Sequence, residues 1–597
     1  MPELQTFRTA CQGGLDVTSS VLTMADTKPG GAISLLNYES SLYGGYRKLS
    51  GYNHEYGTVP GVGPALGVLV KDGVNDGVFA CRKPSSGSNY LYKWVDSCLS
   101  WDAIPSAGSP TMTGVEKVRM LGFNALTSTK FIMTDGINPA ATYDGTTYLQ
   151  LNGAGTPAKP KLAAWYAKHM VLSGDAANPN TLFISAPDNE ADYSSANGGA
   201  TFTVSFEVKA LKAFRDSLFI FGTNSISKLT GNFEGNWAIS EVTDNLGCIA
   251  ENSIIELGGD LLFLGPDGIR PISATDKIGD VELETLSRPI QAITSSLISS
   301  TNLSGIRSVI IRAKSQFRYF YTDLSESYLH DPILITTAMG GAGTIVLNSS
   351  VDFPIAGTII INDEEFSYTN KDTDKRTLTG VSRAVGDTVN AAHSVKAYVR
   401  TTTATLDDPT GIIGSIRDTG WEFGRLGGIQ AHCAHSGYLG NEEFVLHGDT
   451  SGLVFRQEVG STFGTVNISS IFQTPYFDFG DPELRKTMYK ISTYVRAEGD
   501  LAMNMSLIYD YDNVATLNSE NYTVGTTGQG TIFSDIADID TSFTYDAAGA
   551  IYETSNPSVE QAVSGSGKSV SIRFVTNDAN PSHSIQGFAL LFNMEER

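Results

Sequence analysis

The sequence has little cysteine and no long apolar run, and each shortage excludes a class of protein. Its five cysteines are odd in number and widely spaced, which favours reduced thiols in a protein made in the cytoplasm over a disulfide framework. No apolar run reaches the roughly 18 residues of a membrane helix, so no membrane span is expected. The N-terminus lacks a basic region followed by an apolar stretch, so no secretory signal is expected either.

Positive charge is also scarce. The 597 residues include 41 Lys and Arg against 64 Asp and Glu, which gives a net charge of −23. Proteins that read nucleic-acid sequence need a basic footprint, so this class is excluded, whereas a surface along which DNA merely passes is not. A hydrophobic content of 41% with 10% aromatic residues excludes a disordered chain. At about 150 residues per domain, the length predicts two to four domains.

Helical periodicity is nearly absent. The clearest helical segment is 287–297, where Pro289 suits a first turn and Ile290, Ile293 and Leu297 share one face. The rest consists of short apolar runs separated by Gly, Asp and Asn, as in 218–222. This pattern predicts an all-β protein.

The short runs recur as a unit of two strands joined by a tight polar turn. Five copies begin at Phe131, Leu182, Phe219, Phe263 and Phe317, with uneven but similar spacings. Repeats of about 40–50 residues are typical of β-propeller blades, while unrelated hairpins in one or two sandwiches are the alternative.

The regular spacing of the repeats is interrupted between 317 and 444. A self-contained segment in that interval predicts a small β module inserted into one blade. Alternating apolar and polar residues near the C-terminus predict a β-sandwich. The expected organisation is an N-terminal assembly segment (1–80), a propeller (81–339 and 402–470), the inserted module (340–401) and a C-terminal β-sandwich (471–597).

Residues 565–569 read Gly-Ser-Gly-Lys-Ser and resemble part of a phosphate-binding loop. That motif needs a glycine five residues before the Gly-Lys pair, and Ala562 stands there. A hairpin turn is the better prediction.

Two groups of residues have the side chains of metal ligands. His432, Cys433, His435 and His447 lie close in sequence, but neighbouring residues of a strand point to opposite faces and no second cysteine pair exists. The oxygen-rich stretches around 510–513 and 535–540 do not match the calcium-loop pattern. The sequence therefore predicts neither a metal nor a cofactor.

No catalytic residue is predicted. The turn at 142–148 lacks two features of sialidase propeller turns, and the neighbouring carboxylates Glu364 and Glu365 face opposite ways in a strand, unlike a glycosidase pair. Neither a Gly-x-Ser-x-Gly elbow nor a His-Glu-x-x-His motif is present. The protein is expected not to be an enzyme.

Segments over about 10–460 resemble the tail nozzle proteins of short-tailed bacteriophages. The resemblance is carried by GGLD (13–16), KPGGA (28–32), NYE (37–39), GGYRKLSGY (44–52), SISKLTG (225–231) and FLGPDG (263–268). The inserted segment, with LTGVSR (378–383) and AAH (391–393), is similar to a small β module that recurs in phage virion proteins.

This resemblance implies a structural virion protein, assembled in the bacterial host cytoplasm and located at the tail tip. Six copies would form a ring below a tail adaptor ring protein and near tail fibre or tailspike proteins. The ring would retain the genome and then give double-stranded DNA a path for ejection, without sequence-specific binding. Since each copy carries −23, we expect a net acidic lumen along which DNA slides without being held.

The opening segment 13–52 is rich in apolar and aromatic residues but has little regular periodicity. Closed rings use heterologous interfaces, so we expect this segment to contact neighbouring copies through Tyr38, Tyr43, Tyr46 and Tyr52. Its deletion is expected to abolish the ring without unfolding the propeller.

Two other functions remain as alternatives. A host receptor- or glycan-binding tail protein would use the insert surface, where Phe366, Tyr368 and Tyr398 could stack on sugars, although such residues are often core in so small a domain. A propeller glycosidase would require a pair of carboxylates across a cleft.

Overall fold

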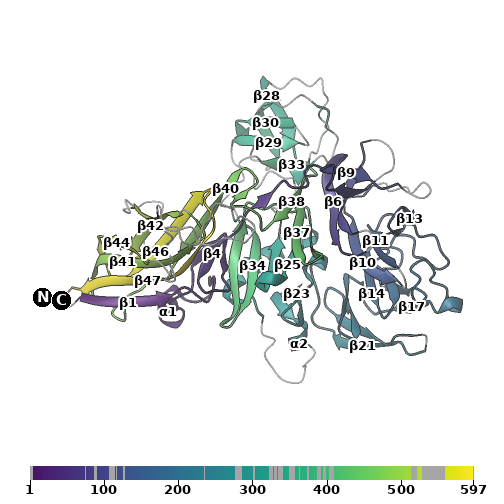
Figure 1. Ribbon diagram of the computed structural model, residues 1–597, viewed down its shortest axis with the longest axis horizontal. Helices are drawn as coiled ribbons and strands as arrows, with labels where there is room; N and C mark the ends of the chain where they lie inside the picture. The colour runs from purple at the N-terminus through teal and green to yellow at the C-terminus, as the bar shows by residue number, and fades with distance from the viewer. Residues whose placement is uncertain are drawn as a thin grey trace, which may run out of the picture.

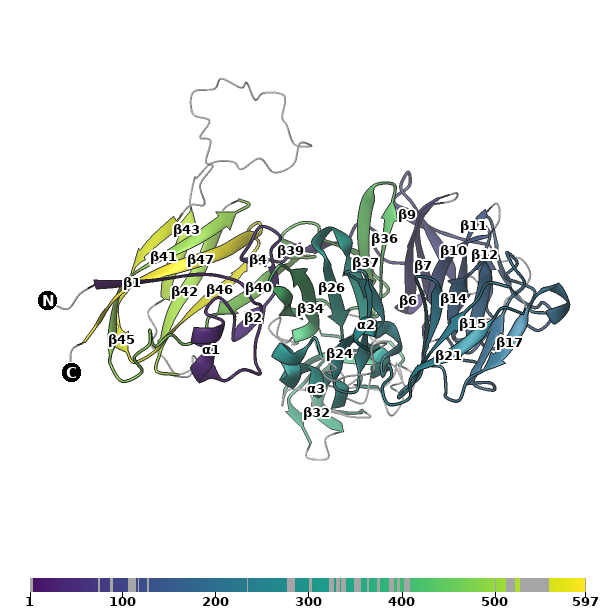
Figure 2. The ribbon, with the colours of Figure 1, turned by 90° about the horizontal axis from the view of Figure 1, so that it is seen from below.

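In the computed structural model the chain is all-β, with a sandwich at one end, a propeller at the other and a small module projecting beside their junction (Figure 1). Both termini lie at the sandwich end (Figure 2). The structure describes residues 4–595 except 74–75, 86–89, 106–113, 116, 126–127, 234, 276–284, 300–302, 322–326, 329–332, 334–339, 348–355, 362–363, 373–375, 386–390, 394–397, 402–408, 500, 512–520 and 527–557.

Five small antiparallel sheets and two four-stranded parts of a larger sheet form the seven blades of the propeller in the described chain, as the repeat predicted. Blades 1 to 3 are β6 (Val62–Lys71), β7 (Gly77–Lys83), β8 (Leu91–Val95) and β9 (Ser100–Ala103); β10 (Arg119–Ala125), β11 (Ser128–Thr134), β12 (Ala141–Tyr143) and β13 (Tyr148–Gln150); and β14 (Leu162–Tyr166), β15 (His169–Ser173), β16 (Thr181–Ile184) and β17 (Ala200–Thr203). Blades 4 and 5 are β18 (Ala210–Phe214), β19 (Ser217–Phe221), β20 (Ile226–Thr230) and β21 (Ala238–Thr243); and β22 (Ile255–Leu257), β23 (Asp260–Gly265) and β24 (Gly268–Pro271). Blades 6 and 7 are β25 (Arg307–Ile311), β26 (Gln316–Phe320), β34 (Pro409–Arg417) and β35 (Gly420–Gly427); and β36 (Cys433–Leu439), β37 (Glu442–Gly448), β38 (Val454–Gln457) and β5 (Tyr52–Asn53).

The ring of blades is closed. The first strands of neighbouring blades contact one another from β6 to β10, β14 and β18, then from β22 to β25 and β36, and β36 contacts β6 again. Blades 4 and 5 share a core in which the rings of Phe221 and Phe263 lie 5.4 Å apart. Each blade buries both of its faces against its neighbours, which explains why the second strands are almost wholly apolar.

Blade 7 takes its outer strand from the N-terminal part of the chain. β5 pairs antiparallel with β38, with Tyr52 opposite Gln457 and Asn53 opposite Arg456. The segment 1–80 is thus divided between the sandwich, blade 7 and blade 1, and does not form the separate assembly segment that was expected.

The sandwich consists of two layers around a common core. One layer contains β3 (Tyr38–Ser40), β4 (Tyr46–Lys48), β47 (His583–Met594), β41 (Lys486–Ala497) and β44 (Ser558–Ala562), with β1 (Leu4–Ala10) beside β47 and β45 (Ser566–Gly567) beside β41. The other contains β2 (Ser34–Leu36), β40 (Val466–Gln473), β46 (Val570–Asp578), β42 (Leu501–Tyr509) and β43 (Asn521–Thr526). The rings of Phe472 and Phe574 stack 5.7 Å apart between the layers, where Ile491 and Phe588 are also buried.

Sandwich and propeller are joined through a continuous sheet. β2 pairs with β35 of blade 6 and with β40 of the sandwich, and β40 pairs with β39 (Thr462–Phe463), which lies beside β5 of blade 7. Two blades therefore share backbone hydrogen bonding with the sandwich.

The inserted module lies between β26 and β34 and has its own core. It contains β27 (Ser327–Tyr328), β28 (Gly340–Val346), β29 (Gly357–Ile361), β30 (Glu364–Tyr368), β31 (Asn370–Lys371), β32 (Thr377–Arg383) and β33 (Tyr398–Thr401). Because β27 pairs with β33, the module begins before the expected residue 340, and its two ends lie side by side.

Helices are few and short among the described residues. They are α1 (Val21–Thr27), α2 (Ile272–Thr275) and α3 (Gln291–Ser299), with 3-10 turns η1 (Ser195–Asn197), η2 (Glu251–Ser253), η3 (Arg288–Ile290), η4 (Leu303–Gly305) and η5 (Arg312–Lys314). The helix predicted at 287–297 is present as η3 followed by α3, with Ile290 and Leu297 buried. No helix in the described part of the chain is long and apolar enough to cross a membrane.

Candidate functional site

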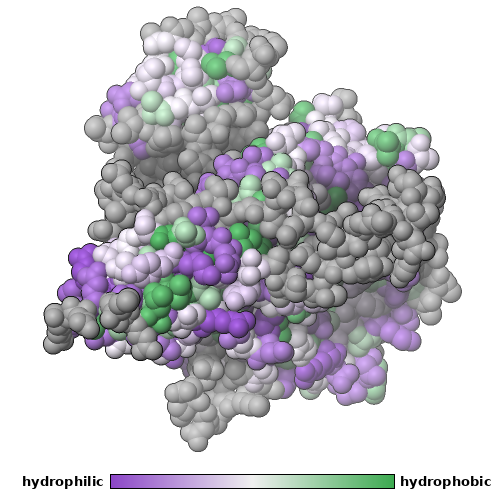
Figure 3. Space-filling model, turned by 60° about the vertical axis from the view of Figure 1, so that its left-hand side comes forward, coloured by the Kyte–Doolittle hydropathy of each residue, from purple (hydrophilic) through white to green (hydrophobic). Residues whose placement is uncertain are grey.

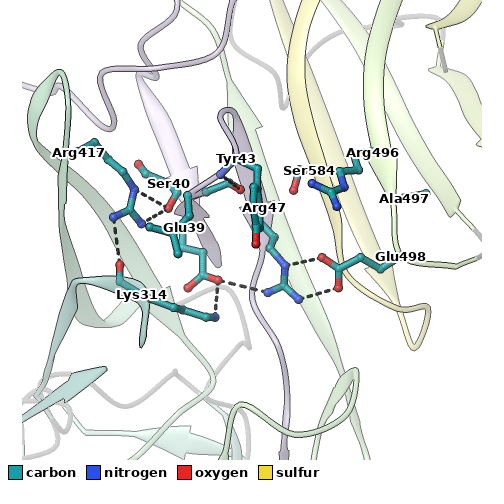
Figure 4. Close-up of a pocket in the computed structure, with 12 residues that line it drawn as sticks. Glu39, Ser40, Tyr43, Arg47, Lys314, Arg417, Arg496, Ala497, Glu498 and Ser584 are labelled. Carbon is teal, nitrogen blue, oxygen red and sulfur yellow. Dashed lines mark hydrogen bonds and ion pairs between the residues drawn. The ribbon is translucent and has the colours of Figure 1, made fainter. Parts of the chain in front are cut away.

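A cavity of about 330 Å³ opens where the propeller meets the sandwich (Figure 4). The hairpin formed by β3 and β4 lies in its middle, η5 and the end of β34 supply the propeller side, and the end of β41 supplies the sandwich side. The hairpin turns at Gly44 and Gly45, which have φ values of 85° and 80°. A Cβ at Gly45 would also collide with the Ile585 carbonyl. Glycine is therefore required there both for the positive φ and for the space.

Glu39 lies at the centre of a buried ion network below the cavity. Its carboxylate is 2.6 Å from Lys314 Nζ, 3.2 Å from Arg47 Nη1 and 3.3 Å from Arg318 Nη2. Burial alone would raise the pKa of Glu39, but the three cations outweigh it and hold the pKa well below its usual range.

Two further carboxylates complete the network. Glu458 pairs with Lys314 and lies 2.5 Å from Arg318, and Glu498 accepts two hydrogen bonds from Arg47 at 2.6 and 2.7 Å. Three carboxylates thus face three cations, and their charges cancel. Such a network fixes the geometry of the groups that it joins, because breaking it leaves a buried charge unpaired.

The network does not have the properties of a glycosidase site. A general acid needs a carboxyl group whose pKa is raised toward the working pH. Burial raises the pKa of Glu458, but Arg318 and Lys314 outweigh it and lower that pKa overall, and the pKa of Glu39 is lowered in the same way. Both groups are held as carboxylates near neutral pH, so this pair offers charge and positioning but no proton.

The four tyrosines expected at the surface divide into two groups. Tyr38 and Tyr46 are fully buried, with hydroxyl groups 2.8 Å from His583 Nε2 and the Gly30 carbonyl. Their burial inside the protomer corrects the expectation that they contact other copies. Tyr52 is half-buried, while Tyr43 at the hairpin tip is 75% exposed and remains a candidate contact.

The described part of the inserted module has a buried polar group beside its core. Phe366 and Tyr368 belong to its core, which corrects their assignment as surface residues. The side chain of Tyr398, in β33, lies outside the described residues. Glu364 accepts two hydrogen bonds of 2.7 Å from Arg383 and lies 2.9 Å from His393 Nε2.

The remaining motifs have structural roles. Cys433 and His447 are buried in neighbouring strands of blade 7, and His435 Nδ1 accepts a hydrogen bond from the Val70 amide at 3.2 Å. The described residues contain no group of three or more His, Cys, Asp or Glu suited to a metal. The run 565–569 is not the expected hairpin, because it includes β45 and connects β44 of one sandwich layer to β46 of the other.

Sequence reasoning missed the junction network entirely. Glu39 and Arg47 lie in segments that carry the resemblance, but nothing there marks them as partners of Lys314, Arg318 and Glu458, which come from distant parts of the chain. The one available signal is a carboxylate, Glu39, beside apolar and aromatic residues, and it does not identify its partners.

The sequence matches no known protein-family model, and no curated protein is similar to it. Among solved structures, Raptor from Chaetomium thermophilum aligns over 68% of this chain and 29% of its own, at 8% identity and a TM-score of 0.32. This chain therefore spans less than a third of Raptor's length. An exo-β-1,3-galactanase from Phanerochaete chrysosporium aligns over 93% and 100% of the two chains, at 10% identity and a TM-score of 0.25. An arabinoxylan arabinofuranohydrolase from Bacillus subtilis aligns over 91% and 98%, at 11% identity and a TM-score of 0.21. The propeller is assigned from the chain's own strand pairing.

Proposed function

We propose that this protein is a structural subunit of a closed ring, as the resemblance to tail nozzle proteins implies, and that the ring gives DNA a path through a short phage tail. The observation that supports this proposal is where the exposed apolar side chains lie along the chain. Of the fifteen large apolar side chains exposed in the described structure, seven lie between Leu4 and Val62. Leu42 and Tyr43 line the junction cavity and Val62 begins β6, so only the exposed apolar side chains near β1 and α1 are candidates for one contact surface.

Four of these side chains lie in or beside β1 and α1, and we name them together the N-terminal surface: Leu4, Val17, Val21 and Leu22. Leu22 is 69% and Leu4 58% exposed. β1 and α1 also border one groove of about 310 Å³, which Phe477 and Phe479 line. On the sandwich side the apolar patches are small and separated by polar ones (Figure 3).

The sheet that carries β1 is suited to head-to-tail contact. β1 pairs with β47, and β44 at the opposite edge pairs with β41; among the described residues no further strand pairs with β1 or β44, although β43 contacts β44. Two different edges on one subunit allow a heterologous interface, which closes into a ring when the rotation between copies permits. Unpaired edges are otherwise a liability that proteins avoid.

Deleting the opening segment is not a clean test of assembly, because β2 to β5 belong to the sandwich and blade 7. A double substitution, Leu4→Lys with Leu22→Lys, changes only exposed side chains. Its matched control is Leu149→Lys, since Leu149 is 51% exposed on blade 2, far from the N-terminal surface.

Purified wild-type protein and the control are expected to form rings around a channel in electron micrographs, with sedimentation matching six copies. The double variant is expected to sediment as a monomer with an unchanged circular dichroism spectrum. The proposal would be overturned if the wild-type protein formed no ring either by itself or when mixed with its adaptor ring protein.

The acidic composition supports the role in DNA passage. Each copy contributes −23, so a ring of several copies repels a DNA duplex except where cations are concentrated. In this role the adaptor ring protein, the tail fibres or tailspikes and the passing DNA are the partners.

A further inference from the structure

The junction cavity contains two arginines that the ion network does not pair. The network balances three cations against three carboxylates. Arg47, Lys314 and, beneath the cavity, Arg318 pair with Glu39, Glu458 and Glu498. Arg417 and Arg496 line the same cavity and form no ion pair within the described structure.

Arg417 comes from the propeller and is held by carbonyl groups only. It donates to Ser40, Lys314 and Ile416, the last two at 3.0 and 2.6 Å. Carbonyl oxygens fix the guanidinium but do not cancel its charge. Burial accordingly lowers the pKa of Arg417 in spite of the more distant Glu39 and Glu422.

Arg496 comes from the sandwich, at the end of β41. Its guanidinium lies over the ring of Tyr43, 4.9 Å from the centroid. Figure 4 shows Arg417 and Arg496 on opposite sides of the hairpin. Arg47, paired with Glu39 and Glu498, lies between them. The residues that line the cavity thus include four cations and two carboxylates in a molecule whose net charge is −23, although Arg496 also interacts electrostatically with Glu498.

We infer that the junction cavity is a binding site for a small anion, a phosphate monoester or a dicarboxylate. Arg496 presents planar donors that match both groups, whereas most N–H groups of Arg417 are already donated to carbonyls, so Arg417 contributes mainly its charge. A volume of about 330 Å³ suits a small molecule, and the exposed Tyr43 and Leu42 at the hairpin tip offer apolar area to the rest of the ligand. This site does not depend on ring formation.

Calorimetric titration of the full-length protein with inorganic phosphate, and separately with succinate, tests the site. The main variant is Arg496→Gln, which removes one cation whose guanidinium lies over Tyr43. Arg496→Lys retains the charge without the planar donors. Lys168→Gln is the matched control, because the Lys168 side chain is 74% exposed on blade 3, away from the cavity.

One of the two anions is expected to bind at one site per chain, about tenfold more weakly to Arg496→Gln and with intermediate affinity to Arg496→Lys. Lys168→Gln should bind like the wild type. The bound anion should also raise the unfolding temperature of the wild type more than that of Arg496→Gln. Failure of both anions to bind, or equal weakening by Lys168→Gln, would overturn the inference. Either result leaves the ring proposal untouched.

Discussion

At the scale of single residues, three histidines with lowered pKa values make this protein sensitive to acid: His447 and His583 are buried and His435 is half-buried. His447 is fully buried in β37, where its ring stacks on Phe455 at 4.8 Å and its Nδ1 lies 3.1 Å from the Gln457 amide. Burial, aided by Arg318, lowers the pKa of His447 to about 3. Burial lowers the pKa values of His435 and His583 to about 4.

The direction of the resulting pH dependence follows from proton binding. The unfolded chain binds a proton at each histidine near pH 6.5, whereas the folded chain does not until the pH is far lower. The stability that the neutral histidines contribute is therefore complete above about pH 6.5 and decreases as the pH falls below it. Each histidine contributes about 1.4 kcal/mol per pH unit in that range.

We predict that His447→Gln reduces this acid sensitivity. Glutamine keeps a hydrogen-bonding group but does not titrate, so between pH 6.5 and 5 the variant should lose about 2 kcal/mol less stability than the wild type. Urea unfolding of both proteins at the two pH values measures the difference. Parallel losses in the two proteins would show that His447 does not carry this effect.

Residue types alone could not separate the tyrosines of the opening segment. Tyr38 and Tyr43 belong to the same aromatic stretch, yet one is fully buried and the other 75% exposed. The difference depends on β47, which pairs with β4 and covers Tyr38 through His583, near the other end of the chain. Composition predicts that a segment makes contacts but not which side chains make them.

At the scale of elements, the closure of blade 7 depends on the very short strand β5. Tyr52 in this strand stacks on Phe463 at 5.1 Å and contacts the rings of His447 and Phe455 at 4.9 Å. The strand joins chain segments that are far apart in the sequence, so its side chain and backbone hold the propeller closed.

We predict that Tyr52→Ala destabilises blade 7 by about 3 kcal/mol, because it empties an aromatic cluster. Hydrogen exchange followed by mass spectrometry should show faster exchange in β36 to β38 than in the wild type. Tyr489→Ala is the control, since Tyr489 is 44% exposed on β41 and should leave these strands unchanged. Unchanged exchange in blade 7 would mean that β5 is dispensable for closure.

The repeat could be predicted because the second strands of the blades are the most apolar. The copies that begin at 131, 219, 263 and 317 fall in β11, β19, β23 and β26, each the second strand of its blade. The copy at 182 falls in β16, a third strand, which explains the uneven spacings around it. The contribution of β5 has no such signal, because so short a strand shows no periodicity and its partner is remote.

At the scale of the whole molecule, the junction network connects sandwich and propeller where the continuous sheet already joins them. Glu39 belongs to a hairpin of the sandwich, whereas Lys314 and Arg318 belong to blade 6. Sequence patterns predicted both bodies but not their connection, since ion pairs between distant segments follow from the completed fold. The network therefore fixes an arrangement that the periodicity of neither body specifies.

We predict that Glu39→Gln costs about 3 kcal/mol at pH 7, because it leaves Lys314, Arg318 and Arg47 with one carboxylate fewer in a buried setting. The pKa of Glu39 is lowered in the folded chain, so its contribution is complete above its ordinary value of 4.5 and is lost as the pH falls below it. The stability difference between wild type and variant should therefore shrink toward pH 2.

Urea unfolding across this acidic range measures the difference, and small-angle scattering at neutral pH reports whether the sandwich still holds its orientation on the propeller. Glu560→Gln is the matched control, because the Glu560 side chain is 58% exposed and pairs only with Lys490 in the described structure, at 2.9 Å. An exposed pair of this kind is worth at most about 1 kcal/mol. If Glu39→Gln cost no more than this control, the continuous sheet alone would hold the two bodies together.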